Sequence, residues 1–331
     1  QALAVWTRIG DAEWENTWRM VVQMPERVKY PQVWKQSTGL LFRPVRNPLE
    51  SKQRRPTELM SLLEDTIRSY GEGGDYQVWM RQLIDQLALE FEQILNDGSN
   101  ATQQSLAKRL LFDNKTPNGS QFIRIGPGSG LDGDDWTGEH YAISRYLVRN
   151  REFQLFDPAQ LVAHNFCKNP DWPATDVSWW DAYWFARFVG QVEVGDEQFI
   201  ATLPTGDQSE HASRAGSKGD YCKGEDGNEV TGMSLSEYAI YSQKSWGSQG
   251  NPDDVGSKKP NYWGIYDFSG NVWVWCIDAR GRERLRRAGS WSSTAGDLQS
   301  RRRHAYHPSF RSSYLGFRLS LSRLDKNEQA E

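Results

Sequence analysis

Cysteine is scarce in this chain: there are three among 331 residues, at positions 167, 222 and 276. They lie far apart, and none belongs to a CxxC pair or to a cysteine and histidine group with zinc-ligand spacing. This spacing argues against a disulfide framework. Cys276 closes an aromatic segment, so we expect it to pack as a small apolar core residue rather than to act as a reactive thiol.

Long apolar runs are also absent. No stretch approaches the roughly 18 apolar residues that a membrane-spanning helix requires. The N-terminal sequence QALAVWTRIGDAEWENTW contains neither the basic n-region nor the apolar h-region of a signal peptide. We therefore expect a soluble protein with no membrane span and no signal peptide in this sequence, while its localisation stays open.

Histidine is rare as well, with five residues: His140, His164, His211, His304 and His307. No two of them form an i, i+4 pair, and none belongs to an HxxxHxE group, which are spacings that bind metal ions on a helix. We expect each to be solvated or hydrogen bonded rather than a metal ligand. The sequence therefore requires no cofactor.

Aromatic residues and glycine, in contrast, are abundant, with 15 Trp, 13 Tyr, 13 Phe and 29 Gly. They predict aromatic-rich packing joined by many turns. With 37% hydrophobic and 25% charged residues, a chain of this length can bury one large core, or one core and a smaller module.

The net charge of −4 gives no general attraction to nucleic acid, but arginines cluster locally. The cluster consists of Arg280, Arg282, Arg284, Arg286, Arg287, Arg301, Arg302 and Arg303. The alternation from 280 to 286 has a period of 2, which predicts one exposed face of a strand. We expect Arg303 to pair with carboxylates, and we do not expect nucleic-acid binding.

Residues 1–115 are predicted to form a partly helical N-terminal extension. Over residues 76–95, apolar side chains recur at helical spacing, with Asp75 as N-cap and Gly98 beyond the end. A second helix is predicted at about residues 57–70. The apolar faces of these helices need a partner, which is the main domain, each other or another protein.

The rest of the chain divides into a main domain, residues 116–324, and a polar tail, residues 325–331. Three capping signals predict helices in the main domain. They are Ser178, for a helix that runs to Phe188 with Gly190 after it; Thr205 with Gln208, for a helix that ends near Gly216; and Ser234 with Glu237. Residues 218–260 are otherwise rich in Gly, Ser, Asp and Asn, which predicts a long loop with one short helix.

The segment of residues 286–318 combines two kinds of position. A framework is formed by Gly289, Ser290, Trp291, Arg303, Pro308, Arg311, Gly316, Phe317 and Arg318. The irregular positions, which show no apolar recurrence at a period of 2 or 3.6, are Ser292, Ser293, Thr294, Asp297, Arg302, His304, Ala305, Tyr306, His307, Phe310, Ser312, Ser313 and Tyr314. The lack of a packing period predicts surface contacts held on a framework.

The residue types at the irregular positions suit a binding surface. Tyr306, Phe310 and Tyr314 offer large contact areas with few rotatable bonds, and the serines offer adaptable hydrogen bonds. The alternative is an ordinary polar loop whose aromatic rings are tucked under their neighbours. Among the framework residues, Trp291 and Phe317 are expected to pin both ends of the segment to the core.

Motifs in order along the chain carry a family resemblance. The blocks are Val177-Ser178-Trp179 with Asp181-Ala182, then Leu203-Pro204-Thr205 with Glu210, Ala212 and Arg214, then NYWGIYDFSGNVWVW from Asn261 to Trp275. Together with the GSW and GFR ends of the 286–318 segment, they resemble the formylglycine-generating-enzyme type of C-type lectin fold, also called the sulfatase-modifying factor family. The resemblance covers about two thirds of the chain. It implies an α+β fold of short twisted strands with flanking helices.

What the resemblance implies for activity depends on cysteine. Oxidase members of the family use a thiol pair within and just after the GSW block to bind copper and activate oxygen, and this chain has no cysteine there. The iron-dependent sulfoxide synthases of the fold need a histidine cluster on an added helical domain. We therefore expect no enzymatic activity. The resemblance also implies a structural calcium ion near Asp267 and Asn271, although Val274 stands where the family usually has a carboxylate.

A third branch of the fold resembles the chain best: the variable proteins of diversity-generating retroelements. In these systems a reverse transcriptase replaces adenines of a template repeat and rewrites the C-terminal repeat of the target gene. An asparagine codon changed only at its two adenines encodes Ser, Thr, Asp, Arg, His, Ala, Tyr or Phe, among others, but never Lys, Gln, Glu, Met or Trp. None of the irregular positions carries an excluded type.

The resemblance therefore implies a hypervariable, receptor-like protein that binds a protein or another macromolecular ligand with its irregular positions. Two alternatives stay open, namely an oxidase or inactive oxidase relative, and a glycan-binding lectin. The chain lacks the EPN, QPD and WND signatures of calcium-type lectins. The sequence does not determine the ligand or the oligomeric state.

Overall fold

The structure, a computed structural model, describes residues 121–127, 129–157, 160, 165–194, 197–243 and 250–323. They belong to the second of two compact units, residues 101–331. The helices predicted at 57–70 and 76–95 and the polar tail at 325–331 lie outside the described residues. Among the described residues, no helix has the length and apolar character needed to cross a membrane.

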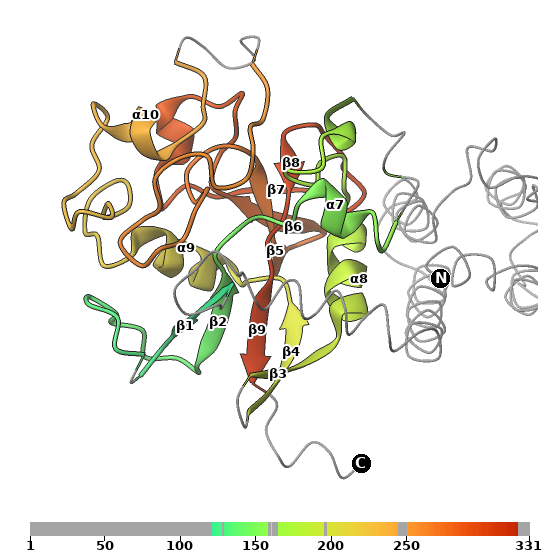
Figure 1. The fold of residues 1–331 in the computed structure, drawn as a ribbon, viewed down its shortest axis with the longest axis horizontal. Coiled ribbons are helices and arrows are strands. Elements are labelled where there is room, and N and C mark those ends of the chain that lie inside the picture. The colour runs from blue at the N-terminus through green and yellow to red at the C-terminus, as the bar shows by residue number, and fades with distance from the viewer. Residues whose placement is uncertain are drawn as a thin grey trace, which may run out of the picture. The chain divides into compact units, whose positions relative to one another are not determined.

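An antiparallel sheet of five strands has β9 as its central strand (Figure 1). Its spatial order is β1 (Phe122–Ile125), β2 (Tyr141–Ser144), β9 (Ser320–Arg323), β4 (Glu197–Thr202) and β3 (Gln191–Val194). In β9, Leu321 lies opposite both Ala142 and Ala201 and has no exposed surface. The strand that follows the 286–318 segment is therefore the centre of this sheet, and the segment must fold back onto the domain.

A second sheet has four strands and carries the segment itself. Its order is β7 (His304–Tyr306), β6 (Glu283–Arg287), β5 (Trp273–Arg280) and β8 (Leu315–Gly316). β5 pairs with β8 in parallel, and the other two pairs are antiparallel. Val272, just before β5, and the first four residues of β5 (273–276) have no exposed surface. The strand next to the segment is therefore a core strand.

Helices flank these sheets in Figure 1. α8 (Trp179–Val189) begins at Ser178, whose hydroxyl accepts a hydrogen bond from the Asp181 amide, and ends at Gly190 with φ of 71°. α9 (Gly206–Arg214) begins with the Thr205 and Gln208 capping box. Both predicted helix starts are confirmed, because each cap satisfies amide groups that the first helical turn leaves unpaired.

The third capping signal is wrong in detail. α10 (Leu235–Tyr238) follows Ser234, but the side chain of Ser234 makes no capping bond to the helix. Its hydroxyl instead accepts a hydrogen bond from the backbone amide of Thr231 at 3.0 Å. The short helix forms, and the serine closes the turn before it.

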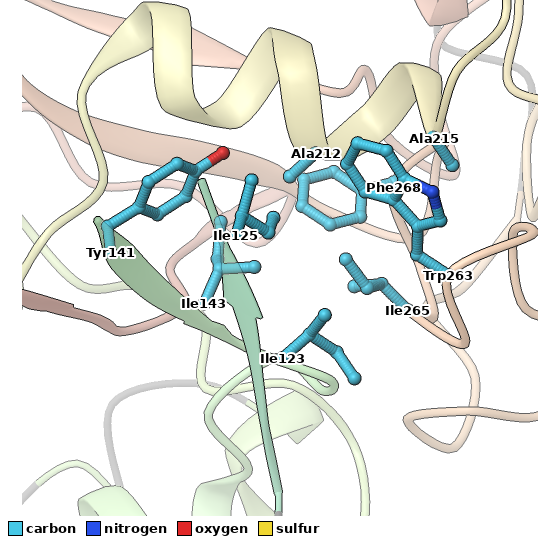
Figure 2. Packing of buried hydrophobic residues seen from close by; sticks show 9 residues of the cluster. All are labelled: Ile123, Ile125, Tyr141, Ile143, Ala212, Ala215, Trp263, Ile265 and Phe268. Atoms are coloured by element: carbon cyan, nitrogen blue, oxygen red, sulfur yellow. The ribbon is translucent and has the colours of Figure 1, made fainter. Parts of the chain in front are cut away.

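One hydrophobic cluster of the core lies between α9 and the first two strands, as Figure 2 shows. Ile125 and Ile143 project from β1 and β2 toward Ala212 of α9, and Phe268 completes the cluster from the NYWGIYDFSGN motif. The Tyr141 hydroxyl donates to the Gln208 carbonyl at 3.1 Å. The motifs at residues 203–214 and 261–275 are thus joined in one core.

Candidate ligand-binding surface

Residues 286–318 pass from the end of β6 through a 3-10 helix, η3 (Ala295–Leu298), to β7 and β8. Two glycines show how closely the path is packed. A Cβ on Gly316 would lie 2.5 Å from the Ala174 carbonyl oxygen, and a Cβ on Gly289 would lie 2.6 Å from Leu298 Cδ1. Gly289 also has a φ of 70°. The framework glycines are required for close approach of the backbone.

The GFR end of the framework is locked in the core. The ring of Phe317 is fully buried, with its centroid 5.3 Å from that of Phe185 in α8. Arg318 is fully buried, and its guanidinium donates to the carbonyl oxygens of Ser144, Tyr266 and Asp267 at 2.9, 2.7 and 3.2 Å. Hydrogen bonds to three carbonyls compensate part of the cost of burying the charge.

The middle of the framework is attached to the start of α8. The Pro308 carbonyl accepts a hydrogen bond from the Trp179 amide at 2.9 Å. Arg311 forms an ion pair with the buried Asp181 and donates to the Asp176 carbonyl at 3.1 Å. The loop that carries Phe310 to Tyr314 is therefore fixed at its base.

Arg303 does not behave as expected. We expected it to pair with carboxylates as part of the framework, but its side chain is exposed, and none of the ion pairs found among the described residues includes it. The turn at residues 300–303 lies at the surface before β7 begins, so the side chain extends into solvent.

Three irregular positions are buried, against our expectation of surface contacts. The exposed fraction is 4% for Ser292 and 0% for Ser293, and the hydroxyl of each lies 3.1 Å from the Ser290 hydroxyl. His307 is 9% exposed, and its Nδ1 lies 2.7 Å from the Ser309 hydroxyl. These side chains are hydrogen bonded within the turns that follow β6 and β7, which holds them against the domain.

The other ten irregular positions keep accessible surface. Arg302 is exposed, and the rest are partly exposed: Thr294, Asp297, His304, Ala305, Tyr306, Phe310, Ser312, Ser313 and Tyr314. The rings of Tyr306 and Phe310 have centroids 4.6 Å apart, and those of Phe310 and Tyr314 are 6.4 Å apart. The rings of Tyr306, Phe310 and Tyr314 therefore form a contiguous layer, named here the aromatic layer.

The arginine alternation is only partly an exposed face. Arg286 is 1% exposed, and its guanidinium carbon lies 4.1 Å from the centroid of the Tyr306 ring and 4.4 Å from that of Trp273. Arg284 lies 4.0 Å over the Trp179 ring, and Arg287 is buried in an ion pair with Glu210 at 2.9 Å. The expectation of an exposed face was wrong for Arg286, because side chains of β5 and β7 cover it.

The cysteines are all buried. Burial raises the pKa of Cys222 and of Cys276 to about 12, so almost none of either thiol ionises near neutral pH. Among the residues that the structure describes, no group of three or more histidine, cysteine or carboxylate side chains is arranged to hold a metal ion.

The oxygens near the expected calcium position already accept hydrogen bonds. Asp267 is buried, and its carboxylate accepts from the Gly256 amide at 2.8 Å and from the Asn271 side-chain amide at 3.3 Å. The Asn271 carbonyl oxygen accepts from the Asp253 amide at 3.3 Å. Burial raises the pKa of Asp267, opposed by the Gly256 amide and by Arg318. The residues form a hydrogen-bonded turn in which each of these oxygens already has a protein donor.

The fold and the site together define an α+β scaffold that presents an aromatic layer from a largely buried framework. Residues 134–322 match the family model described as "Sulfatase-modifying factor enzyme 1-like domain". The match covers more than half of the chain, so the chain belongs to this family, as the motifs implied.

Curated relatives include chlamydial proteins named serine/threonine-protein kinase pkn1. The protein from Chlamydia caviae is 26% identical over 221 residues, which cover 60% of this chain and 31% of the relative. The protein from Chlamydia trachomatis is 22% identical over 302 residues, which cover 82% of this chain and 44% of the relative. The chain thus spans less than half the length of these relatives.

Three solved structures illustrate the similarity that a structural comparison finds for this chain. Treponema denticola variable protein 1 is 24% identical with a TM-score of 0.44, over 55% of this chain and 84% of that one. PvdO from Pseudomonas aeruginosa is 21% identical with a TM-score of 0.45, over 61% and 91%. The Major Tropism Determinant U1 variant is 11% identical with a TM-score of 0.35, over 56% and 50%. These scores are too low to carry a functional argument.

Proposed function

We propose that this chain is a ligand-binding protein without enzymatic activity, whose 286–318 segment is diversified by a retroelement to bind varied macromolecular targets. One observation carries the proposal. The three large aromatic residues at irregular positions form a partly exposed layer, while Pro308, between the first two of them, and Phe317 and Arg318, after the last, are buried.

The division between framework and layer makes diversity tolerable. Surface substitutions away from packing, caps and buried polar groups usually change the free energy of unfolding by about 0.5 kcal/mol or less. Replacement of a buried aromatic residue such as Phe317 costs about 3 to 5 kcal/mol. Ten accessible irregular positions can therefore vary on one fold, provided that the framework stays constant.

The residue types support the same proposal. The accessible irregular positions hold Thr, Asp, Arg, His, Ala, Tyr, Phe and Ser, all of which an asparagine codon gives when only its adenines change. Tyrosine and serine together are also the residues that paratopes use, because tyrosine gives contact area at low entropic cost. A partly exposed layer of such residues suits protein surfaces as ligands.

Catalysis by a copper-bound thiol pair has no support in this chain. The cysteines are buried, and none lies in residues 286–318. Protonated thiols with a pKa of about 12 are poor metal ligands and poor nucleophiles. An oxidase would be recognised by copper-dependent oxygen consumption, and a glycan-binding lectin by glycan binding that requires calcium.

The proposal is tested with two displayed libraries on the full chain. In one, the ten accessible irregular positions are replaced by adenine-mutagenised asparagine codons. In the matched control, ten solvent-exposed positions elsewhere in residues 121–323 are mutagenised with the same codons. We expect most members of both to fold, and binders to a panel of unrelated proteins to emerge only from the first. Equal recovery of binders from both libraries would contradict the proposal.

The flanking DNA gives an independent test. We expect a near-copy of the codons for residues 286–318 that differs only at adenines, beside a reverse-transcriptase gene. A complete locus without such a copy would remove the retroelement from the proposal and leave a binding surface of fixed sequence.

A further inference from the structure

Beneath the aromatic layer lies a buried positive charge that forms no direct ion pair, although the Asp297 carboxylate acts on it from further away. Arg286 is 1% exposed, and none of the ion pairs among the described residues includes it. Its Nε and Nη1 atoms have no hydrogen-bond partner. Its side chain is hydrogen bonded to that of Tyr314. Its other contacts are aromatic: the rings of Trp273 and Tyr306 lie 4.4 and 4.1 Å from the guanidinium carbon, and that of Tyr314 lies 5.7 Å away.

Two more buried nitrogen atoms without a partner lie beside this guanidinium. The indole Nε1 of Trp273, a residue with no exposed surface, makes no hydrogen bond, and neither does Nε2 of His304. The centroids of the Trp273 and His304 rings are 5.0 Å apart. The nearest carboxylate to His304, that of Asp297, lies 3.7 Å from Nε2 and also accepts from the Thr294 hydroxyl.

Such a group of atoms is unusual inside a protein. Buried polar groups are nearly always hydrogen bonded, and buried charges are nearly always paired, because an unmatched group loses its hydration without compensation. Arg287 and Arg318 each have one buried nitrogen without a hydrogen-bond partner as well, but the first pairs with Glu210 and the second donates to three carbonyl oxygens. Arg286 has neither a paired carboxylate nor a set of carbonyl acceptors.

We propose that Arg286, Trp273 and His304 form a binding site for a carboxylate group of the ligand, which enters when the Tyr306 ring turns aside. A carboxylate is planar and accepts two parallel hydrogen bonds from a guanidinium edge. The indole N–H donates to the same group. That the carboxylate belongs to a macromolecular partner, as an acidic side chain or a chain terminus, rests on the proposed function.

The position of Tyr306 explains how one fold can tune this site. Tyr306 is partly exposed at the end of β7, so its ring can change rotamer without unfolding the strand. It is also an irregular position, as is His304, while Trp273 lies outside the segment and Arg286 is its first residue. Substitution at position 306 would open or close the site, and substitution at position 304 would add or remove a nitrogen atom that contacts the ligand. The charge of Arg286 would stay the same in all of these variants.

The site is tested without any partner, with sodium formate as the probe at low ionic strength. The readout is the indole N–H resonance of Trp273 in a ¹H–¹⁵N spectrum of the full chain. We expect a saturable shift for the wild type and for Arg280→Met, which removes an equal charge from an exposed side chain. We expect loss of the shift in Arg286→Met. Equal, unsaturable shifts in all three proteins would overturn the proposal.

Two further arms keep the test decisive if Arg286→Met fails to fold. Tyr306→Ser removes the covering ring, so the dissociation constant for formate should fall at least several-fold, whereas Tyr306→Phe should leave it within twofold. No change in Tyr306→Ser would overturn the entry route. Inorganic phosphate that binds more tightly than formate would overturn the carboxylate assignment. These results are independent of binder selection, so failure here and failure of the proposed function are distinguishable.

Discussion

The indole nitrogen of Trp291 donates a hydrogen bond to the backbone carbonyl of Ser313, across 3.2 Å. This bond joins the two ends of the irregular segment, 22 residues apart in sequence. A framework side chain thus holds an irregular position by its backbone, and the side chain of that position stays free to change.

Replacement of Trp291 should therefore destabilise the domain. Its ring is partly buried, so we expect Trp291→Ala to lower the free energy of unfolding by about 2 to 3 kcal/mol, less than for a fully buried aromatic residue. Trp291→Phe keeps most of the ring but loses the hydrogen bond, which should cost about 1 kcal/mol. Urea denaturation measures both. Ser313→Ala is the control and should be nearly neutral, because the acceptor is a backbone carbonyl.

Gly316→Ala should be destabilising by about 1 to 3 kcal/mol, because overpacking forces the backbone to shift. The new Cβ would lie 2.5 Å from the Ala174 carbonyl oxygen and 3.0 Å from Val272 Cγ2. Gly296→Ala is the matched control, since its Cβ would meet nothing closer than 4.0 Å. Equal thermal midpoints for the two variants would show that the framework is looser than the packing indicates.

Phe310 and Phe317 should respond differently to the same change. Phe310→Ser removes a partly exposed ring of the aromatic layer, and we expect it to cost about 1 kcal/mol or less. Phe317→Ser removes a ring with no exposed surface, packed on Phe153 and Phe185, and should cost about 3 to 5 kcal/mol or prevent folding. Chemical denaturation of the two variants compares them, and similar losses would argue against a separable layer.

His304 should make stability depend on mildly acidic pH. Burial lowers the pKa of His304, and the nearby Arg286 charge lowers it further. The unfolded chain then binds a proton more readily than the folded chain, so the stability that the neutral ring contributes is present above about pH 6.5 and is lost as the pH falls through the folded pKa. We expect acidification from pH 7.5 to 5.5 to lower the Tm of the wild type more than that of His304→Ser. Equal decreases would show that His304 is not responsible.

Calcium should not stabilise this domain. A bound ion would raise the Tm with its concentration, because only the folded state would hold it. The Asp267 and Asn271 oxygens already accept hydrogen bonds from Gly256, Asn271 and Asp253. We therefore expect equal melting curves in calcium and in EDTA. A calcium-dependent rise that Asp267→Asn abolishes would restore the calcium site that the family resemblance implied.

Much of the fold could be predicted from local sequence. Ser178 and Thr205 mark helix starts because a cap satisfies amides within one turn, an interaction that depends on a few neighbouring residues. Ser234 has the same pattern, but it bonds back to Thr231 instead. The family motifs also indicated the α+β scaffold, and the helices and the two sheets of the structure confirm it.

The sequence by itself indicated most of the framework, with Arg303 as the exception, and it determined which residue types occupy the positions between the framework residues. Only the tertiary structure decided which of those positions face outward. Ser292 and Ser293 are buried in the turn after β6, whereas Tyr306 and Phe310 form a partly exposed layer, although all four looked alike as irregular positions. The same holds for Arg286. It belongs to the same period-2 alternation as Arg284, but the rings of Trp273 and Tyr306 bury it. Exposure depends on elements that long-range strand pairing brings together, and local spacing carries no information about them.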